Sequence, residues 1–147
     1  EQAGGRSSVL ICGGETTVSI PHPSLTPGLR ARSESGAMPP EPQPQGGRCQ
    51  ELALSAARVL GEAGEAARGI TLLAAGTDGR DGPTDAAGAW VDAHTWDAIR
   101  DAGRDPGAAL AAHESYAALA VAGALLHTGP TGTNVADVVI GSIAAGA

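Results

Sequence analysis

Residues 70–85 read ITLLAAGTDGRDGPTD and join a continuous apolar run to an Asp-rich loop. The run at 70–75 has the length of a strand and predicts one that is buried on both faces of a parallel sheet. The loop that follows carries Asp78, Asp81 and Asp85 between three glycines and a proline. Glycine lets backbone N–H groups approach a ligand, and carboxylates this close together repel one another unless a cation or hydrogen-bond donors neutralise them.

Two interpretations of this Asp-rich loop stay open from the residues alone. Mg²⁺ commonly takes one or two carboxylates together with substrate phosphates and waters, so the loop could belong to a magnesium–phosphate site. Alternatively, the carboxylates cap a helix near Thr84 and fix tight turns. In that case Asp85 is the residue best placed to start the helix.

The elements expected around the loop alternate between strands and helices. Strands are predicted at 8–12, 16–20, 89–91, 125–128 and 135–143, with the first two joined by a Gly-Gly-Glu turn. Helices are predicted at 48–60, 85–89, 95–102, from Pro106 onward, and at 116–122 with Ser115 as the N-cap. This alternation predicts an α/β fold with a layered, mainly parallel sheet flanked by helices. Ligands of such sheets gather at the loops beyond the carboxyl ends of the strands.

Large apolar residues are scarce in this chain. Of its 147 residues, 30 are Ala and 26 are Leu, Ile or Val, and there is no Phe. Seven of the ten prolines lie at 21–45, which predicts a disordered loop or insertion. We therefore divide the chain into a strand region at 1–20, the Pro-rich segment at 21–45 and an α/β domain at 46–147. The thin core and the start at Glu1 indicate a fragment with one face made to pack on a missing partner.

Charge and cysteine usage exclude several classes of protein. A formal charge of −7, no lysine and nine scattered arginines cannot form the basic stripe that nucleic-acid binding needs. No apolar run approaches the roughly 20 residues that cross a bilayer, so a membrane partner is not expected. Cys12 and Cys49 lack the spacing of a metal site and are too few for a disulfide framework, which favours a cytoplasmic location.

Two further segments have the composition of ligand-binding loops. Residues 128–134, TGPTGTN, offer hydroxyls, an amide and mobile backbone to an anionic ligand, or they form a turn between strands. Residues 46–51, GGRCQE, place backbone donors and Arg48 at a helix start, an arrangement that binds anions. Arg48 can instead be a solvated first-turn residue, with Gln50 or Glu51 as a capping partner.

Four segments, taken in order, resemble the signatures of the glycerate 2-kinases, formerly named hydroxypyruvate reductases, whose C-terminal part is called the MOFRL domain. They are LICGGETTV at 10–18, GGRCQELAL at 46–54, GTDGRDGPTDAAGA at 76–89 and TGPTGTNVAD at 128–137. The resemblance implies a magnesium-dependent transfer of a phosphoryl group from ATP to the 2-hydroxyl of D-glycerate, which yields 2-phosphoglycerate. It also implies that this chain is the C-terminal domain of a two-domain enzyme, with the active site in the cleft to a missing N-terminal domain.

Carried over position by position, the resemblance assigns roles within all four segments. It implies catalytic roles for Arg48, Asp78 and Asp81, with Asp78 and Asp81 also holding Mg²⁺. The implied substrate- and phosphate-binding residues are Gly14, Glu15, Gly47, Gln50, Thr77, Gly79, Thr131, Gly132, Thr133 and Asn134. Phosphoryl transfer needs cations, and a chain without lysine depends on the missing domain for them. The isolated chain is therefore expected to be inactive.

Two other functions stay open from the sequence. An NAD(P)H-dependent hydroxypyruvate reductase is disfavoured because no Gly-x-Gly-x-x-Gly fingerprint follows a strand here, although a missing domain could hold one. A non-catalytic remnant or interaction module would account for the fragment, for the insertion at 21–45 and for Cys49, which stands where the family usually has Asn.

Overall fold

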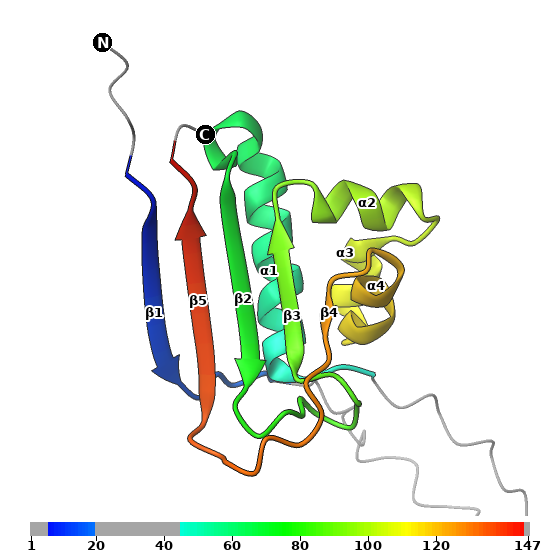
Figure 1. Cartoon of the computed structure of the whole chain (residues 1–147). Helices are drawn as coiled ribbons and strands as arrows, with labels where there is room; N and C mark the ends of the chain where they lie inside the picture. Colours follow the sequence, from blue (N-terminus) through cyan, green and yellow to red (C-terminus); the bar gives the residue numbers. More distant parts are fainter. Residues whose placement is uncertain (1–5, 20–44, 146–147) are drawn as a thin grey trace, which may run out of the picture.

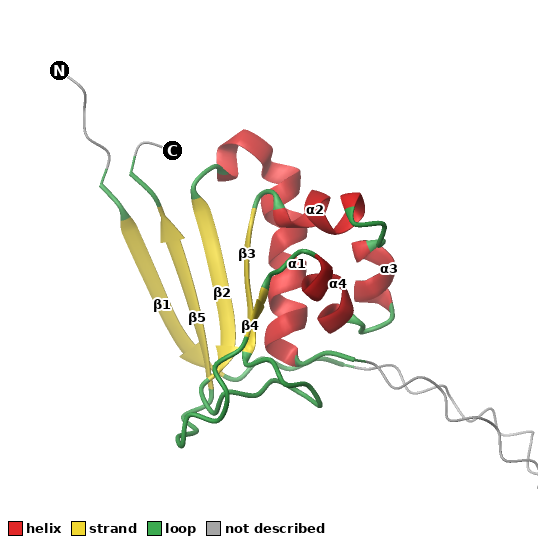
Figure 2. Cartoon of the chain, turned by 45° about the vertical axis from the view of Figure 1, so that its right-hand side comes forward, coloured by secondary structure: helices red, strands yellow, loops and turns green. Residues whose placement is uncertain are grey.

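The computed structural model describes residues 6–19 and 45–145, and nearly all of the Pro-rich segment predicted at 21–45 lies outside these described residues. Within them the strands form one sheet (Figure 1), and the helices lie to one side of it (Figure 2). The elements in chain order are β1 (Ser8–Gly14), α1 (Arg48–Ala63), the 3₁₀ turn η1 (Gly64–Ala67), β2 (Ile70–Gly76), β3 (Gly88–Asp92), α2 (Thr95–Asp101), α3 (Pro106–Ala111), α4 (Ser115–Val121), β4 (Leu125–Leu126) and β5 (Asp137–Ile143).

The sheet is antiparallel, so the predicted parallel arrangement is wrong, while the mixed α/β composition is confirmed. The strand order is β1-β5-β2-β3-β4, and every neighbouring pair runs antiparallel. Parallel neighbours need a crossover of a dozen or more residues, usually a helix. The connection between β2 and β3, residues 77–87, contains no helix. The apolar run at 70–75 reflects a strand that is apolar on both faces, although helices cover only one of them.

The helix predicted at 85–89 is absent, because this backbone bonds to the sheet and to the loop. Ala87 N–H donates to the carbonyl of Leu126 at 2.8 Å, and the carbonyl of Ala87 accepts from Gly76 at 2.8 Å. The carbonyl of Ala86 accepts from Asp81 N–H at 2.8 Å. These bonds hold the segment extended as it enters β3.

The predicted hairpin between 8–12 and 16–20 is also wrong. The strand at 8–12 exists and continues to Gly14, but it pairs with β5, and residues 15–19 form no regular element. β1 therefore joins the sheet through a strand more than a hundred residues away in the sequence. Local alternation predicts where a strand lies but carries no information about a partner so distant along the chain.

Alanine-rich packing explains how a chain with few large apolar residues builds a core. α1 packs on β2 and β3 and buries Ala53, Leu54 and Ala57 on its inner face. The strands contribute small residues to the same core, including Ala74 and Ala89, so that helix and sheet approach closely. α2, α3 and α4 pack against α1 and complete this layer. Each described helix is too short or too polar to cross a bilayer.

The short helices begin largely where the sequence indicates. α2 and α3 confirm the predictions at Thr95 and Pro106, and Asp105 caps α3 by accepting from two backbone N–H groups. α4 is present, but Ser115 is not its N-cap; Glu114 occupies that position without a capping bond. The Ser115 side chain is buried against Gly46, where an added Cβ would lie 2.2 Å from its Oγ. Packing therefore decides its orientation.

One position in β3 requires glycine, because the backbone of β2 approaches it closely. A Cβ added at Gly88 would lie 2.0 Å from the carbonyl oxygen of Ala74, whereas a Cβ at Gly141 in β5 would meet nothing within 4 Å. We expect Gly88→Ala to lower the free energy of unfolding by about 1–3 kcal/mol. Gly141→Ala, the matched control, is expected to change it by no more than about 1 kcal/mol. Urea unfolding measures both, and equal effects would contradict this account of Gly88.

Candidate functional site

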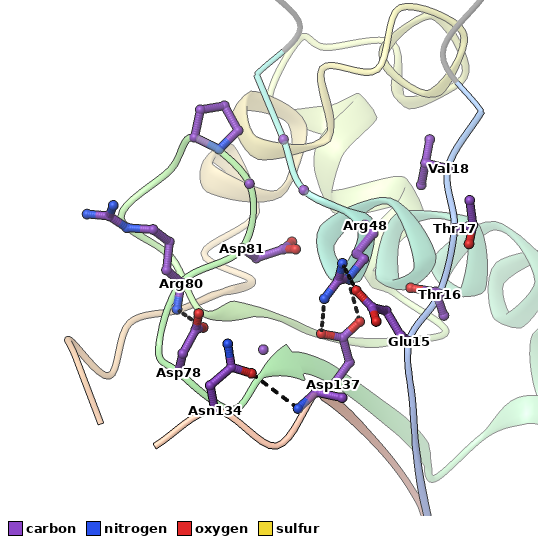
Figure 3. Close-up of a pocket in the computed structure, with 16 residues that line it drawn as sticks. Glu15, Thr16, Thr17, Val18, Arg48, Asp78, Arg80, Asp81, Asn134 and Asp137 are labelled. Carbon is purple, nitrogen blue, oxygen red and sulfur yellow. Dashed lines mark hydrogen bonds and ion pairs between the residues drawn. The ribbon is translucent and has the colours of Figure 1, made fainter. Parts of the chain in front are cut away.

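A cavity of about 680 Å³ opens at the sheet edge where β1 and β2 end and where β5 and α1 begin (Figure 3). Its lining comes from four stretches of chain, residues 15–18, residues 46–48, most of residues 76–83, and residues 134, 136 and 137. Each of these stretches overlaps one of the four sequence segments described above. The antiparallel order brings them together because β1 and β2 run toward this edge while β5 runs away from it.

Arg48, in the first turn of α1, makes two ion pairs in this cavity. Its Nε and Nη2 donate to the two carboxylate oxygens of Asp137 at 2.6 and 3.0 Å, and its Nη1 donates to Glu15 at 2.7 Å. The Asp137 side chain is only 5% exposed, whereas Glu15 is 65% exposed. Hydrogen bonding to Asp137 raises the pKa of Arg48. The guanidinium is thus held from its buried side, and its Glu15 side faces solvent.

Asp137 is the site residue that sequence reasoning missed. It ends the segment TGPTGTNVAD and begins β5, yet no role was assigned to it from the sequence. A signal was present: it is the single acid within the apolar stretch VADVVI at 135–140. A carboxylate at the start of a buried strand requires a partner, because burying an unpaired charge is costly.

Asp81 caps α1 from a distant part of the chain. Its two carboxylate oxygens accept from the backbone N–H groups of Cys49 and Gln50 at 3.1 and 2.8 Å, and the residue is 4% exposed. Gly47, at the N-cap position, has no side chain for this task, and a Cβ there would lie 2.2 Å from the Asp81 carboxylate. Burial raises the pKa of Asp81, and the two amide donors partly offset that effect.

The contacts of Asp81 and Asp85 bear on both interpretations of the Asp-rich loop. A carboxylate of the loop does cap a helix, but that helix is α1 and not one near Thr84. The backbone donors at 49 and 50, which the sequence offered to a bound anion, are occupied by this carboxylate. Asp85 starts no helix; its carboxylate accepts from the Tyr116 hydroxyl at 2.8 Å, which lowers the pKa of Asp85.

The Asp-rich loop is tied to the loop at 128–134. Thr77 Oγ1 donates to the carbonyl of Ala136 at 2.7 Å and accepts from Val135 N–H at 2.9 Å. Thr131 donates its hydroxyl to the carbonyl of Thr77 and its N–H to that of Asp78. Gly79 has a φ of +88°, and a Cβ there would lie 2.0 Å from the carbonyl oxygen of Gly129. Close contact between the two loops thus requires glycine at this position.

The structure separates the predicted site residues into two groups. Those that line the cavity are Glu15, Gly47, Arg48, Asp78, Asp81 and Asn134. Those outside its lining are Gly14, Gln50, Thr77, Gly79, Thr131, Gly132 and Thr133. The second group includes residues that shape the walls, such as Thr77 and Thr131, and a fully buried one, Gln50, whose Nε2 donates to the carbonyl of Asp81 and to Thr84.

Cys49 and Glu51 also take up structural positions at the start of α1. Cys49 is 1% exposed, and burial raises the pKa of its thiol, which leaves it unsuited to act as a nucleophile. Glu51 is not a capping partner: its carboxylate meets Nδ1 of His113 at 2.9 and 3.0 Å. His113 lies between α3 and α4 and has a left-handed backbone, with a φ of +56°.

The cavity carries more negative than positive charge. Two arginines, Arg48 and Arg80, face four carboxylates, those of Glu15, Asp78, Asp81 and Asp137. Among residues 6–19 and 45–145, no group of three or more His, Cys, Asp or Glu side chains is arranged to hold a metal ion. An anionic ligand in this cavity therefore needs cations beyond those that the described residues provide.

Comparison with known proteins places these features in a family. The model of the MOFRL family matches residues 8–137. The D-glycerate 2-kinase of Thermotoga maritima is 45% identical over 138 residues, which are 94% of this chain and 27% of the relative. A protein of Agrobacterium vitis, provisionally named hydroxypyruvate reductase, is 43% identical over 89% of this chain and 25% of its own length.

Solved structures give the same result. The crystal structure of a glycerate kinase from Thermotoga maritima aligns with a TM-score of 0.69 at 45% identity, over 93% of this chain and 27% of that one. The chain thus spans about a quarter of the length of the relatives it matches.

Proposed function

The chain belongs to the MOFRL family, and from this membership we propose that it is the C-terminal part of a glycerate 2-kinase that phosphorylates D-glycerate with ATP to give 2-phosphoglycerate. The observation that carries the proposal is the Arg48 clamp, a guanidinium held by the buried Asp137 in a cavity built from the four family-like segments. The similarity to glycerate kinases supports the same reaction. In this proposal the active site is the cleft between this cavity and an N-terminal domain.

The proposed work of this chain is to position and neutralise anionic groups. Phosphoryl transfer proceeds with little covalent participation by the protein, and positioning and charge stabilisation dominate its catalysis. Arg48 Nη1 would exchange the exposed Glu15 for a substrate carboxylate or phosphoryl oxygen, while Nε and Nη2 stay on Asp137. Because Asp137 fixes the plane of the guanidinium, the outward N–H group is already oriented when substrate arrives.

Mg²⁺ fits this cavity as a metal carried largely by substrate phosphates. Asp78 is half-buried in the lining, and its Oδ1 accepts from the backbone N–H of Arg80 at 3.0 Å. Mg²⁺ usually binds one or two carboxylates together with phosphates, so a single carboxylate is a sufficient protein share. We propose that Asp78 provides it and that Asp81 fixes the loop on α1. When bound, Mg²⁺ would neutralise charge on the phosphates.

A kinase assay on the full-length protein that carries this chain tests the proposal. We expect D-glycerate-dependent formation of ADP from ATP, and no oxidation of NADH or NADPH with hydroxypyruvate. The 147-residue chain alone is expected to form no ADP, because its cavity lacks the cations that the reaction needs. Oxidation of NAD(P)H with hydroxypyruvate would contradict the kinase proposal and support a reductase instead. Neither activity in the full-length protein would favour a non-catalytic module.

A further inference from the structure

Within residues 6–19 and 45–145, no helix covers one face of the sheet, and most positions on that face are apolar. Ala74, Ala89 and Val91 point toward the helices and lie in the core. The residues that alternate with them point to the opposite face, because successive side chains of a strand lie on opposite sides of a sheet. Figure 2 shows the helices on only one side. We call the opposite side the open face; its positions on four strands are Val9, Ile11, Gly13, Thr71, Leu73, Ala75, Gly88, Trp90, Asp92, Val138, Ile140 and Ser142.

The register arranges the open face in rows that cross the strands. The middle row consists of Ile11, Ile140, Leu73 and Trp90, one from each of β1, β5, β2 and β3. Ile11 is 67% exposed and Trp90 is 45% exposed. The row nearest the cavity is formed by small residues and one valine, Gly13, Val138, Ala75 and Gly88. Ala75 is only 4% exposed and Gly88 is buried, so the accessible apolar surface of the open face lies mainly on the middle row and on Val9.

The open face has almost no charge. Asp92, at its corner, is the one charged residue among the twelve positions, although the chain as a whole has a formal charge of −7. Contiguous apolar surface of this kind, free of charge at its middle, is characteristic of an interface and is uncommon on a free surface. Ile11 and Trp90 are exposed and Leu73 and Ile140 between them are half-buried, so the row is a continuous apolar stripe in a chain that has few large apolar residues.

The length of the relatives indicates what covers the open face. This chain matches 27% of the Thermotoga maritima enzyme, so about three-quarters of such a polypeptide lies outside the matched part. A second copy is a poorer occupant, because two chains of charge −7 repel each other on approach. The open face also reaches the cavity edge, since Ala75 precedes Gly76 of the cavity lining. A partner that closes the cavity is therefore well placed to cover this face.

We propose that the open face is the docking surface for the remainder of the full-length polypeptide, which lays an uncharged, apolar helical surface across the row Ile11–Ile140–Leu73–Trp90. The result is a three-layer arrangement with the sheet in the middle. The proposal concerns how the polypeptide packs and does not depend on which reaction it catalyses.

Three neighbouring residues of β1 make a matched test. Val9, Leu10 and Ile11 are 64%, 68% and 67% exposed, yet Val9 and Ile11 lie on the open face while Leu10 points to the helix side. Each is replaced singly by cysteine in a background with the exposed Cys12→Ser, while the buried Cys49 is kept. Maleimide labelling rates are measured for the native full-length protein and for the same protein unfolded in urea. ATP-dependent activity is measured separately, so that the docking result and the kinase result are read independently.

The expected pattern alternates along the strand. In urea the three thiols should react at rates within about threefold of one another, because the unfolded chain exposes all of them. In the native full-length protein Val9→Cys and Ile11→Cys should react at least about tenfold more slowly than Leu10→Cys. Equal rates in the full-length protein, or equal protection of all three, would overturn the assignment to the open face. Alternating protection that disappears when a dimer of the full-length protein is diluted to monomers would overturn it in favour of a second copy.

Discussion

Replacing Arg48 by alanine is expected to lower kcat/KM for D-glycerate in the full-length protein by about a thousandfold, the scale on which a single arginine stabilises a phosphoryl-transfer transition state. The expected loss is large because Arg48 is the cavity cation held on two sides, by Asp137 at 2.6 Å and by Glu15 at 2.7 Å. Steady-state kinetics with ATP measures it. Arg68→Ala is the matched control, since the partner of Arg68 among the described residues is Glu65 on the surface. This substitution should leave kcat/KM unchanged.

A loss of activity in Arg48→Ala must be separated from a loss of structure. Without Arg48, the 5% exposed Asp137 carboxylate is left unpaired, which we expect to cost about 1–3 kcal/mol of unfolding free energy. The cost stays below that of a fully buried pair because Arg48 is itself 38% exposed. The double variant Arg48→Ala with Asp137→Asn removes the unpaired charge. It should regain stability and not activity; recovery of activity would exclude Arg48 from the site.

Replacing Asp81 by alanine is expected to destabilise the chain by about 2–4 kcal/mol, the cost of losing two charge-assisted hydrogen bonds at a buried helix start. Both carboxylate oxygens are engaged, at 3.1 Å to Cys49 N–H and 2.8 Å to Gln50 N–H, and those amides would be left without acceptors. Urea unfolding followed by circular dichroism measures the loss. Hydrogen exchange at these two amides should become faster at the same time.

Asp78→Ala is the matched control within the same loop. Asp78 accepts one backbone N–H, that of Arg80, at 3.0 Å in an exposed turn, so its removal should cost less than about 1 kcal/mol. In the full-length protein Asp78→Ala should affect metal dependence more than Asp81→Ala does. It should raise the Mg²⁺ concentration needed for activity. A loss below 1 kcal/mol for Asp81→Ala would refute its role as the cap of α1.

The local elements of this protein could be predicted from the sequence. The helix at 48–60, the strand at 70–75, the strand at 135–143 and the helix beginning at Pro106 are all present within one to three residues of their expected bounds. Periodicity, N-terminal proline and apolar runs act over a few residues, so they can be recognised locally. The four segments around the cavity were likewise identified, because their glycines and acids form unusual local patterns.

The partners of these elements depended on the tertiary structure. β1 pairs with β5, and Asp81 caps a helix that begins at Arg48. The residues that neighbour these positions in the sequence give no indication of either contact. Asp81 was interpreted as a metal ligand or the cap of a nearby helix because both of those interpretations are local; its actual acceptor role joins positions 31 and 32 residues apart.

The sequence by itself determined where most of the helices and strands lie and that the core is rich in alanine, and it singled out the segments that meet at the cavity. Only the tertiary structure decided that the sheet is antiparallel, that Arg48 is held by Asp137, and that the described helices all lie on one side of the sheet. The physical reason is the distance along the chain over which each kind of interaction acts. Backbone preferences and side-chain periodicity are set within one or two turns of chain, whereas strand pairing, trans capping and ion pairing are set by which surfaces can be buried together.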